Sequence, residues 1–135
     1  MSVHNDVLKG LKEYLTQNSA YKPFVKTFAS GSDYPMVVFE KVGDIERSSD
    51  MQRKTTISTI TYEINIFAKN KTVGTTNVLN INIANEIESH IKNYMGKKLG
   101  MKRTYDKPSP NVDSSIYRIT MRYTVSLNET KNYFI

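Results

Sequence analysis

The sequence predicts an α+β fold, in which two helices pack on one face of an antiparallel or mixed four-stranded sheet. Two segments, residues 55–69 and 115–127, alternate apolar and polar side chains as half-buried strands do. Two others, residues 3–15 and 79–95, repeat apolar side chains at helical spacing. The order of a helix, two strands, a helix and two strands favours both helices on the same face. A chain of 135 residues suits a single domain, 1–135.

The first helix is expected to begin after Ser2, a suitable N-cap, and to end near Asn18. Its apolar residues lie three and four positions apart and share one face: Val3, Val7, Leu8, Leu11, Tyr14 and Leu15. Residues 24–28 are predicted to form either a short strand or a packed loop, and residues 31–33 a turn. A strand follows from Tyr34 to Glu40, with Pro35 at its start or on a sheet edge, because proline cannot donate a hydrogen bond to a ladder.

Residues 41–54 mix both charge signs with glycine and serine and hold few apolar side chains. We expect them to form a long loop that is mobile in the free subunit and becomes ordered on assembly, because loops of this length in small domains usually carry a function.

Each of the two clearest strands has an apolar and a polar face, and the apolar faces are expected to cover the helical stripes. The polar faces carry Thr, Asn, Glu and Arg, including Glu63, Arg118 and Arg122. The predicted core combines both strand periods with both helical stripes: Leu11, Leu15, Ile60, Ile64, Ile66, Ile83, Ile87, Ile91, Ile119, Met121 and Val125.

The second helix is expected to be capped by Thr75 or Thr76 and to end at Gly96. Its apolar residues recur at every fourth position: Leu79, Ile83, Ile87 and Ile91. Residues 99–105 are predicted to form a strand and residues 107–111 a loop. The chain then finishes in a tail, 128–135, with three apolar residues at its end: Tyr133, Phe134 and Ile135. We expect these either to fold back on the core or to contact a neighbouring molecule.

Composition restricts the possible functions. The chain has no cysteine, so it holds neither disulfides nor thiolate metal sites. No secretory signal and no apolar run long enough to span a membrane is visible, so we expect a soluble intracellular protein. The formal net charge is +6. Much of the excess lies in a basic patch: Lys92, Lys97, Lys98, Lys102, Arg103 and Lys107. Such a patch is usually a solvated surface, and otherwise attracts anionic partners such as nucleic acid.

No pattern indicates catalysis. The two histidines, His4 and His90, are far apart in sequence, and the carboxylates are scattered. Phosphate-binding glycine loops and nucleophile-elbow motifs are missing from the sequence. We therefore predict no catalytic residue, no cofactor and no metal site.

The arrangement resembles the tail terminator proteins of long-tailed bacteriophages, also described as tail completion, head-to-tail joining or minor capsid proteins. An N-terminal amphipathic helix precedes Tyr34-Pro35-Met36-Val37-Val38-Phe39. A charged loop follows, and after it come Tyr62-Glu63-Ile64-Asn65-Ile66-Phe67, one helix and a final long strand with alternating arginines. The resemblance covers nearly the whole chain and rests on the order and size of the elements.

The resemblance implies a non-enzymatic ring, commonly of six subunits, which ends tail-tube polymerisation and provides the surface that joins the head. It implies contacts with the tail-tube protein, with a head-completion or connector protein, and with DNA that passes through without sequence recognition. The protein would be located in the virion tail or neck, and in the host cytoplasm during assembly. Residues expected at subunit interfaces are Arg118, Arg122, Glu63, Tyr133, Phe134 and Ile135. The alternatives are another phage neck or connector protein and a basic nucleic-acid-binding module.

Overall fold

The computed structural model describes residues 3–27, 31, 33–49, 56–109, 113–128 and 133–134. Its elements, in chain order, are α1 (Val3–Asn18), β1 (Phe24–Lys26), β2 (Met36–Ser49), β3 (Thr56–Ala68), β4 (Lys71–Val73), β5 (Thr76–Val78), α2 (Asn80–Ile91), the π-helix η1 (Lys92–Lys98), β6 (Lys102–Ser109), β7 (Tyr117–Asn128) and β8 (Tyr133–Phe134). The α+β class is therefore confirmed.

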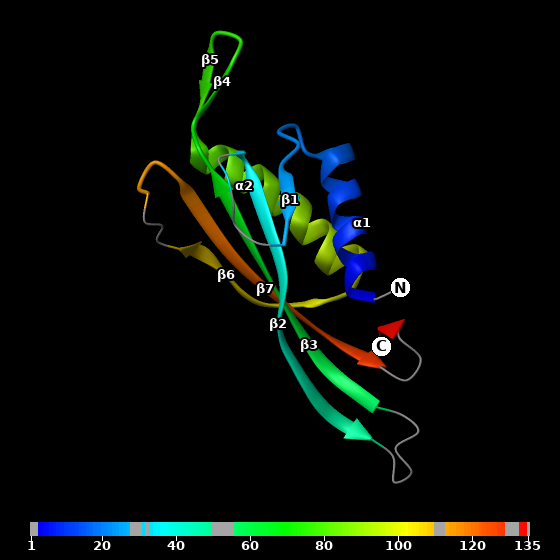
Figure 1. Ribbon diagram of the computed structural model, residues 1–135. Helices are drawn as coiled ribbons and strands as arrows, with labels where there is room; N and C mark the ends of the chain where they lie inside the picture. The colour runs from blue at the N-terminus through cyan, green and yellow to red at the C-terminus, as the bar shows by residue number, and fades with distance from the viewer. Residues whose placement is uncertain are drawn as a thin grey trace.

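The main sheet is mixed and has more strands than the four predicted. Its order is β1-β2-β3-β7-β6, and β8 adds to the end of β7. Strand β1 runs parallel to β2, and the other pairs are antiparallel. The additional strands are short or come from segments predicted as loops. Strands β4 and β5 form a separate hairpin that projects from one end of the molecule (Figure 1).

Both helices lie on one face of the sheet, as predicted (Figure 1). The apolar stripes of α1 and α2 and the apolar faces of β3 and β7 enclose one core, and all eleven residues predicted for it are buried. Burial of this apolar surface is the main driving force for the fold. Gly10 lies where α1 crosses η1, and a β-carbon there would collide with the Tyr94 hydroxyl, so a glycine permits the close approach of the two helices.

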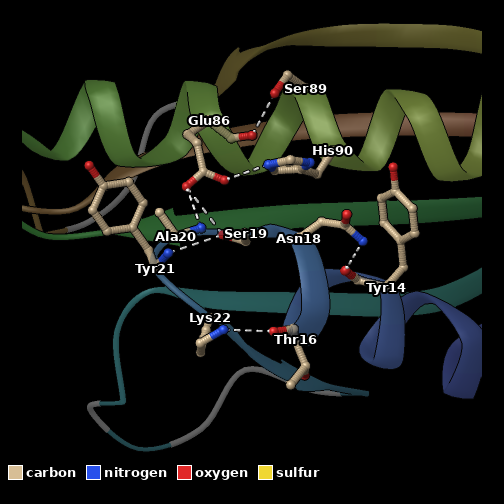
Figure 2. Close-up of polar contacts among 10 residues, drawn as sticks. All are labelled: Tyr14, Thr16, Asn18, Ser19, Ala20, Tyr21, Lys22, Glu86, Ser89 and His90. Carbon is tan, nitrogen blue, oxygen red and sulfur yellow. Dashed lines mark hydrogen bonds and ion pairs between the residues drawn. The ribbon is translucent and has the colours of Figure 1, made fainter.

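A polar contact also fixes the end of α1 against α2, and the sequence patterns did not reveal it. Figure 2 shows Glu86 of α2 directed at the turn that follows α1. Its Oε2 accepts hydrogen bonds from Ser19 Oγ (3.3 Å) and from the Ala20 N–H (3.1 Å). Its Oε1 lies 3.0 Å from His90 Nε2, one helical turn away. The Tyr14 ring packs edge-on against His90.

The prediction of a loop over residues 41–54 is wrong for residues 41–49. These residues continue β2 and pair with β3 as far as Ser49 opposite Thr56. Backbone hydrogen bonds hold this ladder, so it does not need the apolar side chains whose scarcity suggested a loop. The pairing has bulges between Lys41 and Gly43 and between Glu46 and Ser48. Residues 50–54 lie outside the described part of the chain.

The extended part of this hairpin is called the β2–β3 arm here and comprises residues 42–49 and 56–61. It reaches beyond the N-terminal end of α1 (Figure 1). Two of its apolar side chains, Val42 and Ile45, are about half exposed.

The expected boundaries of α2 are also wrong. Neither Thr75 nor Thr76 caps the helix, because this stretch forms the β4–β5 hairpin, and Asn70 Oδ1 instead accepts a hydrogen bond from the Asn80 N–H (2.8 Å). Helical structure continues through Gly96 as η1. The left-handed residue that follows is Gly100 (φ +69°), so the chain reverses there.

The strand predicted at residues 99–105 is shifted toward the C-terminus. Strand β6 includes Lys107, Pro108 and Ser109, which were predicted as loop. Pro108 is tolerated because β6 is an edge strand. In the part of the chain that the structure describes, no helix is long and apolar enough to cross a membrane.

Replacing Ile87 with alanine should lower the free energy of unfolding by about 2–5 kcal/mol, because the side chain is fully buried between α2 and the sheet. Ile81→Ala is the matched control, since Ile81 lies on the same helix but is 41% exposed. Urea denaturation measures both. Equal losses for the two variants would contradict the packing of α2 described here.

Candidate assembly surface on the outer face of the sheet

The face of the sheet opposite the helices carries the predicted interface residues on its two central strands. The register of β3 and β7 places Glu63 opposite Arg122 and Phe67 opposite Arg118. Since side chains alternate along each strand, these residues all point away from the apolar core. The predicted polar face is therefore formed as expected.

Arg122 is held from two sides within its own subunit. Its Nη2 donates to Glu63 Oε1 at 3.3 Å. Its guanidinium also lies 5.4 Å from the centre of the Tyr105 ring on β6. The side chain remains 48% exposed. Glu63, expected as a carboxylate for a neighbouring subunit, thus binds an arginine of the same chain, and Arg122 keeps donors free for a further acceptor.

Arg118 belongs to a hydrogen-bonded row across three strands. Its Nε donates to Asn65 Oδ1 at 3.0 Å, and its guanidinium lies 5.3 Å from the centre of the Phe67 ring. Asn65 Oδ1 also accepts from Thr120 Oγ1 (2.7 Å), which in turn accepts from Ser109 Oγ (2.7 Å). Asn65 and Thr120 are buried although they lie on the outer face. The row fixes Arg118 in one orientation before any partner binds.

The predicted C-terminal interface residues are only partly described. Tyr133 and Phe134 form β8 and pair with Asn128 and Leu127 of β7, so the chain end folds back onto the sheet at the backbone level. Their side chains and Ile135 lie outside the described residues.

The six residues of the predicted basic patch do not form one surface. Lys92 and Arg103 lie on the helix side, where Asp106 accepts ion pairs from both at 3.2 and 3.5 Å. Lys92 also pairs with Glu88 at 3.3 Å, so this group is largely neutralised. Three other residues of the predicted patch lie apart from this group. Lys107 covers the Tyr105 ring on the outer face, Lys98 covers the Tyr14 ring of α1, and Lys102 is exposed on β6.

Lys97 lies on the helix side beside the neutralised pair. Together with Lys92 and Arg103 it lines an open hollow of about 510 Å³. The carboxylates of Glu88 and Asp106 border the three basic groups, so the local charge is mixed.

Both histidines make contacts within the fold. His4 Nδ1 is 2.5 Å from the Tyr62 hydroxyl, and burial raises the pKa of that hydroxyl above its usual value. His90 contacts Glu86, as described above. Among the described residues, no group of three potential ligands is placed to hold a metal ion.

The sequence patterns found the polar face but not the contacts within it. Alternation alone placed Arg118 and Arg122 on the outer side, whereas the pairing of Glu63 with Arg122 depends on the register of two strands separated by about 60 residues. The buried polar row centred on Asn65 has no sequence signature, because its hydrogen bonds join side chains from three strands that are far apart in the sequence.

No protein-family model matches the chain, and no curated protein matches it either. The functional argument therefore depends on the surface itself.

Asn65→Ala should lower the free energy of unfolding by about 1–3 kcal/mol, because it removes the acceptor of two buried or half-buried donors. Asn77→Ala on the exposed β5 strand is the control and should have little effect. Denaturant unfolding gives both values. If Asn65→Ala is as stable as the wild type, the row does not order this face.

Glu88→Gln should raise the free energy of unfolding at pH 7. Burial and the neighbouring Asp106 carboxyl raise the pKa of Glu88 above its ordinary 4.5, although Lys92 opposes the shift. A raised pKa means that Glu88 favours folding below pH 4.5 and that this contribution is lost as the pH rises through the folded-state value. The difference between variant and wild type should therefore vanish near pH 4 and grow toward pH 7 in urea melts. A difference that instead grows in acid would contradict this assignment.

Proposed function

We propose that this protein is a structural assembly subunit of a long-tailed phage or prophage, a tail terminator that forms a ring, ends polymerisation of the tail tube and joins the tail to the head. The observation that supports this best is the outer face of the sheet, where two arginines are held in fixed orientations yet keep unused donors. Ordered polar surfaces with arginine suit wet, specific contacts between subunits.

The distribution of exposed apolar residues on the sheet also supports an assembly role. Phe24, Val42 and Ile45 are each about half exposed. They lie on β1 and β2, the two strands at one edge of the sheet. The β2–β3 arm carries two of them away from the helices. The core of the subunit does not need the apolar surface of this arm, so that surface is available to bind a neighbouring molecule.

The proposed partners are further copies of the same chain in a ring, the tail-tube protein, and a head-completion or connector protein. DNA would pass through the ring without sequence recognition. In the virion the protein would lie in the tail or neck, and before that in the host cytoplasm.

A basic nucleic-acid-binding module is less well supported. Two of the six predicted basic residues are paired with carboxylates, and the others are spread over both sides of the sheet. Any DNA affinity should therefore be weak, independent of sequence and steeply salt-dependent. Tight binding of one DNA sequence at physiological salt would favour the alternative.

The double variant Arg118→Ala, Arg122→Ala should fold but fail to complete tails, because it removes the two oriented guanidinium groups. The pair Lys9→Ala, Lys12→Ala is the control, since it removes the same charge from the exposed side of α1. Complementation of a phage that lacks the gene, scored as infectious particles, gives the readout, and circular dichroism checks the fold. Normal tail completion by the arginine variant would place the interface elsewhere on the subunit.

A further inference from the structure

The two edges of the main sheet differ in charge. On one side, β1 covers β2 only from Met36 to Val38, and among the described strands none pairs with that side of β2 over residues 42–49. On the other side, β6 pairs with β7, and no described strand covers its outer side. Unpaired N–H and C=O groups on both edges are available to a further strand.

The free edge of β2 is acidic. Between Glu40 and Ser49 it carries three carboxylates, one lysine and one arginine, a net charge of −1, and the residues from Glu40 to Glu46 other than Gly43 are exposed. One carboxylate, Asp44, pairs with Lys41 at 3.3 Å, so the remaining acidic side chains of this edge are those of Glu40 and Glu46.

The free edge of β6 is basic. Between Lys102 and Ser109 it carries three basic residues and one aspartate, a net charge of +2. Lys102 and Lys107 are exposed. Pro108 has no N–H, so the part of this edge that can pair is Lys102–Lys107.

We propose that β2 of one subunit pairs with β6 of the next, so that copies of this chain join head to tail through their sheet edges. This inference rests on the proposed assembly role and specifies its contact. The strand directions agree: β2 and β7 run one way and β3 and β6 the other, so two subunits in the same orientation would meet as an antiparallel pair. Opposite charges would then face each other and fix the choice of partner.

The same charges disfavour the simplest alternative, a two-fold dimer through β2 alone. Such a dimer would place the acidic edge against itself, and like charges on paired strands are destabilising. A pairing of unlike edges is heterologous, and it either closes into a ring or continues as an open filament.

The register adds a geometric consequence. Strand β6 lies at the level of residues 36–43 of β2, whereas the β2–β3 arm carries β2 from residue 42 to residue 49. If Lys102–Lys107 of one subunit pair with this outer part of β2, neighbouring subunits are displaced along the strand direction by roughly five residues, or about 17 Å. A closed ring would need strands tilted to its axis to absorb this displacement.

Engineered cysteines test the contact in the purified full-length protein. The chain has no cysteine of its own, so each introduced thiol reports one position. Single variants Val42→Cys and Ile45→Cys mark β2, and Lys102→Cys and Thr104→Cys mark β6. Within one subunit these edges are separated by β3 and β7, about 14 Å, which exceeds the reach of a disulfide. Any bond between them therefore joins two subunits.

Mixing a β2 variant with a β6 variant under mild oxidation at high protein concentration should give mixed dimers in at least one of the four combinations. A chain that carries both cysteines should give a ladder of covalent oligomers. Predominant bonds between two β2 cysteines, or no intersubunit bond in any combination, would overturn the proposal.

Charge reversal provides the second measurement. Asp44→Lys with Glu46→Lys should reduce the mixed dimer by about tenfold or more, and Lys102→Glu with Lys107→Glu in the partner should restore it. Lys9→Glu with Lys12→Glu on α1 is the control and should change nothing. The cross-linking assay contains no phage component, so the absence of mixed dimers would reject the edge contact without rejecting the role in tail completion. Conversely, a protein that forms mixed dimers but fails to complete tails in the complementation assay would support the edge contact and reject the phage role.

Discussion

Uninterrupted antiparallel pairing of β3 with β7, from Ile57 opposite Asn128 to Ala68 opposite Tyr117, is the constraint on which the rest of the structure depends. The pairing has no bulge, so each strand keeps one set of side chains on each face along its whole length. One face meets the helices and forms the core. The other brings Glu63 to Arg122 and Asn65 to Arg118. A slip of one residue would exchange the two faces, so the buried core also fixes the outer surface.

The parts of the fold that depend on periodicity were predictable. Ile60, Ile64 and Ile66 on β3 and Ile83 and Ile87 on α2 are fully buried, because alternating and helical spacing report directly which side of an element meets the core. The class of fold and the placement of both helices on one face follow from the same signals. The orientation of Arg118 and Arg122 was predictable for that reason as well.

The parts held by backbone pairing or by polar contacts were not predictable. The outer half of β2 is rich in charge because it needs no core, so it looks like a loop in the sequence. The contact of Glu86 with Ser19 and Ala20 joins segments that are 66 or more residues apart, and no local sequence pattern predicts it. Helical structure also continues through Gly96 as a π-helix, in which the Tyr94 hydroxyl lies against Gly10, and no cap residue in the sequence marks this continuation.

Electron microscopy of the protein mixed with tubes of the proposed tail-tube partner tests most directly the proposal that this subunit ends a tube. The predicted images show tubes closed at one end by a ring, with a tube length that stops increasing once the protein is added. Tubes that continue to grow with both ends bare, in the presence of excess folded protein, would contradict an assembly role at the tail end.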